Sequence, residues 1–216
     1  GQIADISGGR LVGANLTVRG VMTDSRHSFA ADRMPIFVAI EGVNHDGHRF
    51  VSDLYRRGVR AFMVEHEVDF GLYPEAGFVV VGRSLVALQK LAAYHRSQFR
   101  GKVVAITGSV GKSTTKEMVY AVLQTTYRTG KTPVNHNNDI GMPMALLAMA
   151  EDTQVAVLEM GMNHFREIAY LAQIGRPDYG IITNIGTMHI EHLGSTEGIL
   201  QAKLEILEGM PENGKI

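Results

Sequence analysis

The sequence predicts an α/β protein whose second half forms a parallel, doubly wound sheet. Two patterns carry this prediction. Short apolar runs bounded by glycine, proline or charged residues recur along the chain, as buried strands do. Beyond residue 101 such runs alternate with helical segments, which is typical of a parallel sheet with helices on its faces. We expect a small α/β domain at residues 1–83, a connecting helix at 84–100 and a second domain at 101–216.

The first domain is expected to contain short strands and one or two helices. Three apolar runs predict buried strands, at 36–40, 61–64 and 77–81. Between the first two runs, Phe50 to Arg57 predicts a helix that Gly58 ends. From Ser84 to Phe99, apolar residues recur at helical spacing, which predicts the connecting helix.

The second domain is predicted as alternating strands and helices. Strands are expected at 102–107, 154–159 and 179–184, and helices at about 112–125, 143–149 and 196–208. Asn163 is expected to cap a further helix, which carries Phe165, Ile168, Ala169 and Ala172 on one face. Residues 211–216 predict entry into another strand, so we expect an incomplete sheet and a fragment of a longer protein.

The composition excludes several classes of protein. The 216 residues carry 21 lysines and arginines against 22 aspartates and glutamates, which argues against a nucleic-acid partner bound through a broad basic surface. Cysteine is absent, so there is no disulfide framework, thiolate nucleophile or cysteine-based zinc site. No apolar run is long enough for a membrane span, and residues 1–5 lack the pattern of a signal peptide. We expect a cytoplasmic protein; the oligomeric state stays open, with a monomer as the expectation.

A glycine-rich loop follows the strand predicted at 102–107. Its residues are Gly108, Ser109, Val110, Gly111, Lys112, Ser113 and Thr114. In such a loop the backbone amides turn onto phosphate oxygens at a helix N-terminus, the lysine reaches the β- and γ-phosphates, and the serine hydroxyl ligates Mg²⁺. Ile106 occupies the place of the first glycine of the longer form of the loop, so the compact G-x-x-G-K-S form is present. A plain turn would not require Lys followed by Ser, and we predict a nucleotide site.

Polar residues also stand at the ends of two later strands. Glu159 ends the run at 154–159, and His189 and His192 follow the run at 179–184. Because ligands bind at the carboxyl ends of parallel strands, Glu159 could hold Mg²⁺ and His189 could share the site. The alternatives are a helix cap or surface carboxylate for Glu159, and a loop or core role for each histidine. We favour a functional role for Glu159 and His189 and a structural one for His192.

Lys203 lies near the middle of an apolar helical arc. At about 100° per residue, the arc holds Ile199, Leu200, Ala202, Leu204, Ile206 and Leu207, with Gln201, Glu205 and Glu208 opposite. A lysine there is costly unless its charge is paired or removed. Its long stem could carry the amine to solvent. Alternatively the amine faces the site, as a cation on phosphate or, once neutral, as a carbamate formed with CO₂ that binds a second Mg²⁺.

A set of ordered strings makes the sequence similar to a known family. The strings are residues 108–114, Asn137-Asn138-Asp139-Ile140-Gly141-Met142-Pro143, Glu159-Met160-Gly161-Met162-Asn163-His164, Thr183-Asn184-Ile185-Gly186 ahead of His189 and Glu191, and Ala202-Lys203-Leu204-Glu205. They resemble the Mur ligases of peptidoglycan synthesis. In the first domain, Thr23-Asp24-Ser25-Arg26, residues 37–42 and Asp46-Gly47-His48 resemble that family's UDP-binding domain. The resemblance covers essentially the whole chain.

The resemblance implies an ATP-dependent amide ligase that requires Mg²⁺. The strings at 137–143 and 159–164 favour the family member that joins D-alanyl-D-alanine to a UDP-N-acetylmuramoyl-tripeptide over the member that adds the third peptide residue. ATP would phosphorylate the peptide's carboxylate, and the amine of the dipeptide would attack the acyl phosphate. By resemblance, the catalytic residues are Lys112, Glu159, His189 and Lys203. Ser113 and Glu159 would hold one Mg²⁺, and His189 with carbamoylated Lys203 would hold or orient the second.

The resemblance also implies substrate-binding residues. Uridine and diphosphate would meet Asp24, Ser25, Arg26, Asn44, Asp46, Gly47 and His48, whereas Asn137 and Asn138 would contact substrate or metal-bound phosphates. The family has a longer central domain and a third domain, which complete the adenine and dipeptide sites. We therefore expect that this chain alone does not turn over.

Three other functions stay open at this point. Another ligase of the same superfamily, for a different step of peptidoglycan synthesis or of folyl-polyglutamate or cyanophycin type, would share the second domain, but the strings of the first domain argue against it. A P-loop kinase or nucleotide switch would share the loop but has no need for Lys203 on an apolar face. The chain could also act only as a binding module for a UDP-linked ligand.

Overall fold

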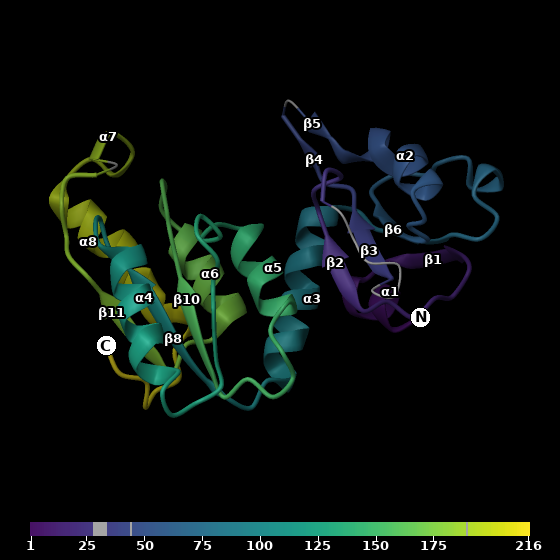
Figure 1. The fold of residues 1–216 in the computed structure, drawn as a ribbon. Coiled ribbons are helices and arrows are strands. Elements are labelled where there is room, and N and C mark those ends of the chain that lie inside the picture. Colours follow the sequence, from purple (N-terminus) through teal and green to yellow (C-terminus); the bar gives the residue numbers. More distant parts are fainter. Residues whose placement is uncertain (28–33, 44, 189) are drawn as a thin grey trace. The chain divides into compact units, whose positions relative to one another are not determined.

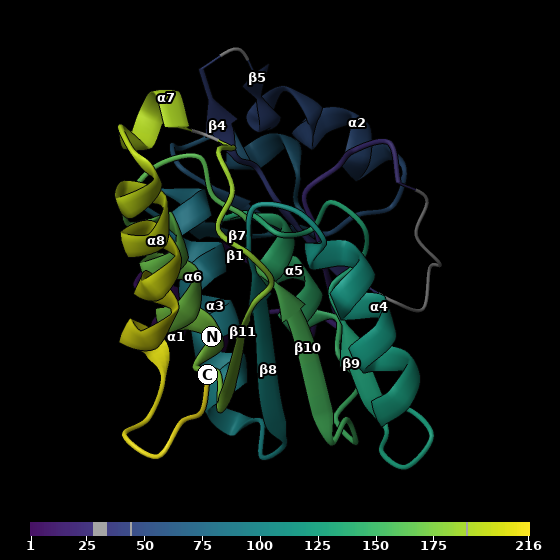
Figure 2. The same cartoon turned by 90° about the vertical axis from the view of Figure 1, so that its left-hand side faces the viewer.

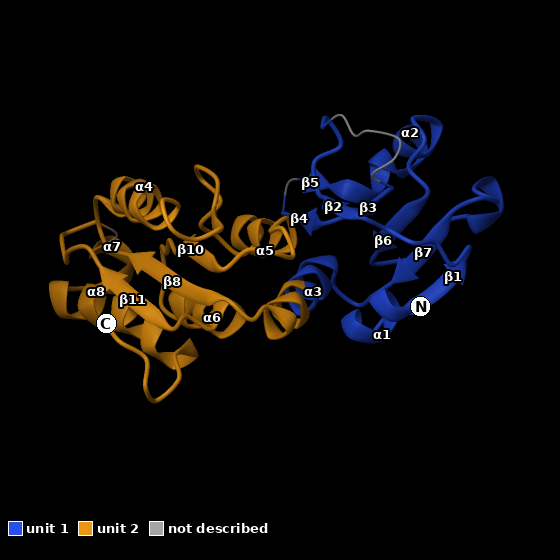
Figure 3. Ribbon diagram, turned by 60° about the horizontal axis from the view of Figure 1, so that its bottom comes forward, with its two compact units in different colours: residues 1–91 blue, residues 92–216 orange. Residues whose placement is uncertain are grey.

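The computed structural model describes residues 1–27, 34–43, 45–188 and 190–216 (Figure 1). The chain divides into two compact units, Gly1–Leu91 and Ala92–Ile216, and the division falls within helix α3 (Ser84–Gln98) (Figure 3). Both units combine helices with strands, so the predicted α/β class is confirmed. Among the residues described, no helix is both long and apolar enough to cross a membrane.

The first unit is built on a five-stranded sheet with the order β1-β7-β6-β3-β2. Its strands are β1 (Arg10–Gly13), β2 (Gly20–Met22), β3 (Pro35–Val38), β6 (Ala61–Val64) and β7 (Gly77–Val80). β1 runs antiparallel to β7, and the other neighbours are parallel. The three predicted strands correspond to β3, β6 and β7. β1 and β2 were not predicted because each is short and only partly buried.

Short elements complete the first unit. They are α1 (Gln2–Ser7), α2 (Val51–Arg56), β4 (Glu41–Gly42) paired with β5 (His45–Asp46), and 3₁₀ turns at Gly47–Phe50 and Phe70–Leu72. The predicted helix at 50–57 is confirmed as α2. One face of the sheet buries Phe37, Phe62 and Phe78, and the rings of Phe62 and Phe78 stack with centroids 5.2 Å apart. These aromatic rings form the centre of the unit's core.

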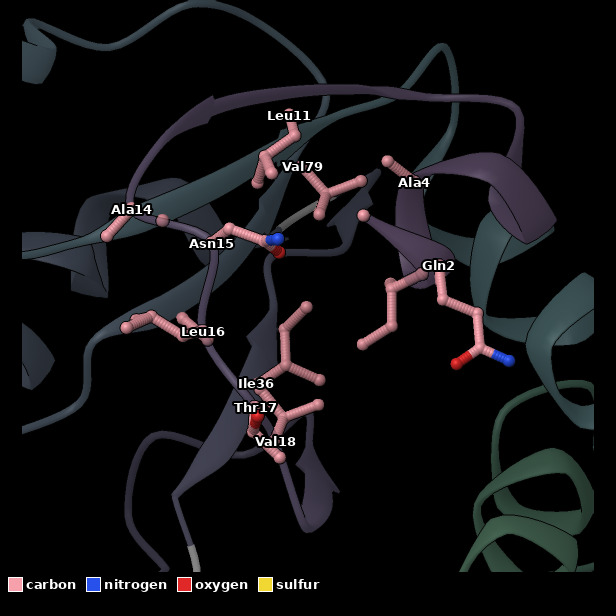
Figure 4. Close-up of a pocket in the computed structure, with 14 residues that line it drawn as sticks. Gln2, Ala4, Leu11, Ala14, Asn15, Leu16, Thr17, Val18, Ile36 and Val79 are labelled. Atoms are coloured by element: carbon pink, nitrogen blue, oxygen red, sulfur yellow. The ribbon is translucent and has the colours of Figure 1, made fainter.

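A cavity of about 300 Å³ opens in the first unit (Figure 4). Ile36 and Ala61 directly precede Phe37 and Phe62 and so belong to the opposite face of the sheet; both line this cavity, as does Val79. None of the lining side chains is charged, and none of the residues predicted to bind substrate lines the cavity. Because diphosphates are held by charged groups and directed donors, this cavity lacks the chemistry for one.

The second unit is built on a four-stranded parallel sheet with the order β11-β8-β10-β9. The strands are β8 (Lys102–Thr107), β9 (Thr129–Lys131), β10 (Val155–Glu159) and β11 (Tyr179–Ile182). The helices are α4 (Lys112–Leu123), α5 (Gly141–Leu147), α6 (Glu167–Gly175), α7 (Ile190–Leu193) and α8 (Thr196–Leu204), and a 3₁₀ turn follows at Glu205–Gly209. The three strands predicted in this half are confirmed as β8, β10 and β11.

Helices cover both faces of this sheet, as a doubly wound fold requires. Val103 and Ala105 of β8 pack in one core with residues of α5, α6 and α8. Val104 and Ile106, which alternate with them, pack on the other face with residues of α4. Figure 2 shows α4 on one side of the sheet and α6 with α8 on the other. The predicted doubly wound parallel sheet is therefore confirmed.

The start of α6 differs from the prediction. Asn163 does not cap it, because the helix begins at Glu167 after Arg166, which has a left-handed φ of 73°. The cap comes instead from Glu205, which is far away in sequence. Its carboxylate accepts hydrogen bonds from the amide of Arg166 at 2.8 Å and from that of Ala169 at 3.2 Å. A distant side chain that satisfies a helix N-terminus leaves no local sequence signal.

The apolar arc around Lys203 is narrower than predicted. Its buried members are Ile199, Ala202, Lys203 and Ile206, which follow i, i+3, i+4, i+7 spacing. Leu200, Leu204 and Leu207 are 42%, 38% and 46% exposed, whereas Glu205, predicted on the polar side, is buried. The α-helix ends at Leu204 and a 3₁₀ turn follows. Beyond Leu204, an angle of about 100° per residue therefore no longer predicts which side chains are buried. The burial of Lys203 itself agrees with the prediction.

We expect Glu205→Ala to destabilise the second unit, because two amides at the start of α6 would lose their acceptors. The loss should be about 1–3 kcal/mol in the free energy of unfolding, measured by urea denaturation. Glu208→Ala is the matched control, since the contact of Glu208 among the described residues is a more exposed ion pair with Arg166 at 2.6 Å. Its effect should stay within about 1 kcal/mol. Equal losses in the two variants would contradict the capping role of Glu205.

Candidate functional site

The phosphate loop connects β8 to α4 at the carboxyl end of the sheet. Gly108 has a φ of 146°, and a Cβ at that position would collide with the side chain of Thr183. Gly111 has a φ of 82° and precedes the first residue of α4. A Cβ at Gly111 would meet open space, so steric crowding does not require glycine there. Glycine is required because other residues rarely adopt this positive φ. The loop therefore has the backbone shape that the G-x-x-G-K-S pattern predicts.

The segment after β11 braces the phosphate loop. The side-chain oxygen of Asn184 accepts hydrogen bonds from the amides of Ser109 and Val110, at 3.1 and 3.0 Å. The Thr183 hydroxyl donates to the carbonyl of Val110 at 2.6 Å, and the amide of Gly186 donates to the Ser109 hydroxyl at 2.9 Å. Lys112 turns back over the loop and donates from Nζ to the carbonyl of Gly108 at 2.8 Å. The segment that follows β11, together with Lys112, thus holds the loop in place.

Glu159 lies at the end of β10 with 3% of its surface exposed, and three side chains approach its carboxylate. The Ser113 hydroxyl lies 3.2 and 3.0 Å from its two oxygens. The side-chain amide of Asn137 donates to Oε1 at 2.9 Å. Nζ of Lys116 lies 3.3 Å from Oε2. The predicted proximity of the loop serine and this carboxylate is therefore present.

Burial and charge couple the lysines of this site. Burial lowers the pKa of Lys203 to about 8, and repulsion from Lys112 adds to this effect. Burial also lowers the pKa of Lys112, whereas the Glu159 carboxylate opposes that shift. Lys112 is thus close enough to interact electrostatically with both Glu159 and Lys203. His189, the fourth residue predicted for this edge, lies outside the described residues.

The donor set at the loop suits a hard divalent cation. Mg²⁺ prefers oxygen ligands and keeps waters or phosphate oxygens beside one or two protein groups. The Ser113 hydroxyl and the Glu159 carboxylate provide such oxygens, and Ser113 is exposed. Within the described part of the chain, no group of three or more His, Cys, Asp or Glu side chains is arranged to hold a metal. A Mg²⁺ ion bound to these two oxygens would have positions left for water and phosphate oxygens.

Asn137 and Asn138 hold parts of the second unit in place. Asn137 donates to Glu159, as described above. The side-chain oxygen of Asn138 accepts from the amides of Ile140 and Gly141 at 3.2 and 2.8 Å, at the start of α5. The side-chain acceptor of Asn138 is thus used within the fold, and its direct contact with a substrate stays a prediction.

The residues predicted to bind the UDP group fall into two turns of the first unit. In one turn the Arg26 guanidinium pairs with Asp24 at 2.6 Å and lowers the pKa of that carboxyl. In the other turn, Nδ1 of His48 lies 2.6 Å from Asp46, and Nε2 accepts from the amide of Glu65 at 2.9 Å. Both ring nitrogens of the buried His48 are therefore engaged inside the protein. Asn44 lies outside the described residues, and the roles of this group toward a ligand stay predictions.

Two residues of the site were given no role from the sequence, and Asn184 was noted only as part of the string Thr183-Asn184-Ile185-Gly186. Lys116 follows Ser113 by three positions, which places both on one side of α4. Asn184 follows β11, next to β8 in the sheet, and so stands at the same carboxyl edge as Glu159. Helical spacing could have indicated Lys116, and the strand-end argument could have indicated Asn184.

The doubly wound sheet and its phosphate loop define a P-loop nucleotide-binding domain. The Mur ligase middle domain family matches residues 106–216. The chain belongs to the Mur ligase family, which removes the kinase and nucleotide-switch alternatives.

The similarity extends to individual relatives over most of this chain. The chain is 44% identical over 198 residues to the UDP-N-acetylmuramoyl-tripeptide–D-alanyl-D-alanine ligase of Bacillus subtilis, covering 91% of this chain and 42% of that protein. It is 39% identical over 213 residues to the ligase of the same name from Escherichia coli, covering 99% of this chain and 46% of that protein. The chain therefore spans less than half the length of the curated relatives it matches.

Solved structures show the same fold. The similarity to MurF from Acinetobacter baumannii has a TM-score of 0.90 at 36% identity, covering 99% of this chain and 46% of that one. The similarity to the MurF ligase of Thermotoga maritima, solved in complex with ADP, has a TM-score of 0.80 at 33% identity, covering 90% and 44%.

We expect Lys203 to titrate near pH 8 in the folded chain, because burial and Lys112 disfavour its charged form. NMR of ¹³C-labelled lysine, following the Cε shift against pH, measures this midpoint. Lys102 is the matched control, because its bond to Asp178 raises its pKa. A Lys203 midpoint at or above the ordinary value of 10.5 would contradict the assignment.

The same shift predicts a pH dependence of stability. The folded pKa lies below the unfolded value of 10.5, so between about 8 and 10.5 the unfolded chain binds more protons than the folded chain. Lys203 should therefore cost stability below pH 8, and the cost should shrink as pH rises through this window. Denaturation of Lys203→Met across the same window should lack this contribution. An unchanged slope in the variant would show that another group is responsible.

Proposed function

We propose that this chain is the nucleotide-binding and precursor-binding part of a ligase of peptidoglycan synthesis. The ligase would use ATP to join D-alanyl-D-alanine to a UDP-N-acetylmuramoyl-tripeptide. The observation that carries the proposal is the contact between Ser113 and Glu159 beside the phosphate loop, because a loop hydroxyl next to a buried carboxylate suits a Mg²⁺–nucleotide complex. The printed names of the relatives from Bacillus subtilis and Escherichia coli supply the substrate pair.

The central difficulty of the reaction is the approach of one anion to another. The terminal carboxylate of the peptide would attack the γ-phosphorus of ATP, the bond to ADP would break, and an acyl phosphate would form. The amine of D-alanyl-D-alanine would then attack the acyl carbon, lose a proton and expel phosphate. Lys112 and the loop amides would compensate phosphate charge as it shifts. Ser113 and Glu159 would hold Mg²⁺, which supplies further charge neutralisation when bound.

Lys203 would contribute to metal binding after its amine has been converted to a carbamate. A pKa near 8 leaves about a tenth of the amine neutral at pH 7. A neutral amine can add to the carbon of CO₂ and lose a proton, which gives a carbamate anion. That anion, together with His189, would hold or orient a second Mg²⁺. The burial of Lys203 and its repulsion from Lys112 support this part of the proposal.

The first unit would hold the UDP group of the precursor. Asp24, Ser25, Arg26, Asn44, Asp46, Gly47 and His48 are the residues proposed for this task. Because both ring nitrogens of His48 are occupied, we assign His48 the role of shaping its turn, and we assign ligand contact to exposed groups of the two turns. A cytoplasmic location and a monomeric state, both expected from the sequence, belong to the same proposal.

We expect the 216-residue chain to bind ADP with Mg²⁺, and Lys112→Met to weaken this binding at least about tenfold, because the phosphates would lose their direct cation. Isothermal titration calorimetry measures both affinities. Ser113→Ala should lose only the part of the affinity that depends on Mg²⁺. Lys102→Met, which removes a lysine from the opposite end of β8, is the control and should bind like the parent chain. Unchanged ADP affinity in Lys112→Met would refute the nucleotide site.

A separate titration tests the precursor. The chain should bind UDP-N-acetylmuramoyl-tripeptide, and Arg26→Ala should weaken that binding while leaving ADP affinity unchanged, since Arg26 lies in the first unit. Binding of neither the UDP-peptide nor ADP would leave the ligase proposal without support. Binding of the UDP-peptide alone would favour a simple binding module.

A further inference from the structure

Lys116 carries a cation into the core of the second unit. Its side chain is 0% exposed, and its Nζ atom makes no hydrogen bond of good geometry in the described structure. A buried ammonium is unfavourable unless a counter-charge lies close by. The nearest carboxylates are Glu159, with Oε2 3.3 Å from Nζ, and Glu117, with Oε1 3.7 Å away. None of the roles assigned so far uses this lysine.

The two carboxylates around Lys116 have different environments. Glu117 is 47% exposed at its side chain and also pairs with Lys131, so water and a second lysine already compensate its charge. The Glu159 side chain is 3% exposed. Its other close partners, Ser113 and Asn137, are neutral donors. Lys116 is therefore the direct counter-charge of Glu159.

This pairing affects any divalent cation that approaches Glu159. A cation bound there would lie within a few ångströms of the fixed positive charge of Lys116, in surroundings that screen charge poorly. The Glu159 carboxylate alone cannot compensate both an ammonium and a divalent ion. Phosphate oxygens from a nucleotide would bring the missing negative charge and the missing ligands together.

We propose that Lys116 is a positioning residue that makes divalent-cation binding at Ser113 and Glu159 conditional on the phosphates of the nucleotide. The inference rests on the proposed nucleotide site and adds an order of binding. The cation binds together with the phosphates of the nucleotide and does not bind before them. In the absence of nucleotide, Lys116 keeps Glu159 compensated and the site closed to free metal.

The test is a Mn²⁺ titration of the full 216-residue chain without nucleotide, with electron paramagnetic resonance reporting free Mn²⁺. The parent chain should show no saturable binding below about 1 mM. Lys116→Met keeps a long side chain but removes the charge, and it should bind free Mn²⁺ at least about tenfold more tightly. Lys131→Met is the matched control, because it removes a lysine that pairs with Glu117 and, among the described residues, forms no hydrogen bond or ion pair with Glu159; it should behave like the parent.

The outcomes separate this inference from the proposed function. Tight binding of free Mn²⁺ by the parent, or no gain in a folded Lys116→Met, overturns the role of Lys116. If thermal melting shows that Lys116→Met is unfolded, the parent titration decides: saturable binding below about 1 mM refutes the inference, and its absence supports it. ADP affinity in the presence of Mn²⁺, measured in parallel by calorimetry, reports on the nucleotide site itself. Its loss in the parent would defeat the proposed function as well.

Discussion

A carboxylate withdrawn from water must be surrounded by donors and cations, and Glu159 at the end of β10 is such a group. The partners of its carboxylate come from two segments: Ser113 and Lys116 from α4, and Asn137 from the stretch between β9 and α5. In that same stretch the Thr132 hydroxyl accepts a hydrogen bond from the backbone amide of Glu159 at 2.9 Å. Satisfying this one buried side chain therefore fixes the phosphate loop, the first turns of α4 and the segment after β9 relative to one another.

The parallel sheet makes this convergence possible. β11, β8 and β10 are neighbours that run in the same direction, so the segments that leave their carboxyl ends meet at one edge. β8 contributes the loop, β10 contributes Glu159, and β11 contributes Asn184, which binds two amides of the loop. The positive charges of Lys112 and Lys203 lie near enough to repel each other. A negatively charged phosphate bound between such groups would relieve this repulsion. The parallel order of the strands therefore supports a nucleotide site at this edge as much as the sequence of the phosphate loop does.

The parts of the site that sequence could predict are those with a local signature. The loop follows from its glycines and its Lys-Ser exit, Glu159 from its place at a strand end, and the burial of Lys203 from helical spacing. The cap of α6 could not be predicted, because its acceptor, Glu205, is far from Arg166 in sequence and joins it only after the fold forms. The exposed Leu207 was assigned to the core because a single α-helical period was extended into the 3₁₀ turn at Glu205–Gly209. In the first unit, β1 and β2 were missed because each is short and only partly buried.

The central claim is that one Mg²⁺–nucleotide complex joins the loop, Ser113 and Glu159 at a single edge of the second unit. A crystal structure of the chain grown with Mg²⁺ and a non-hydrolysable ATP analogue tests it most directly. The account predicts β- and γ-phosphates over residues 108–113, with Lys112 on the phosphates and Mg²⁺ bonded to the Ser113 hydroxyl at about 2.1 Å, with Glu159 in its coordination sphere directly or through water. Phosphates bound elsewhere, or a cation that reaches neither Ser113 nor Glu159, would contradict it.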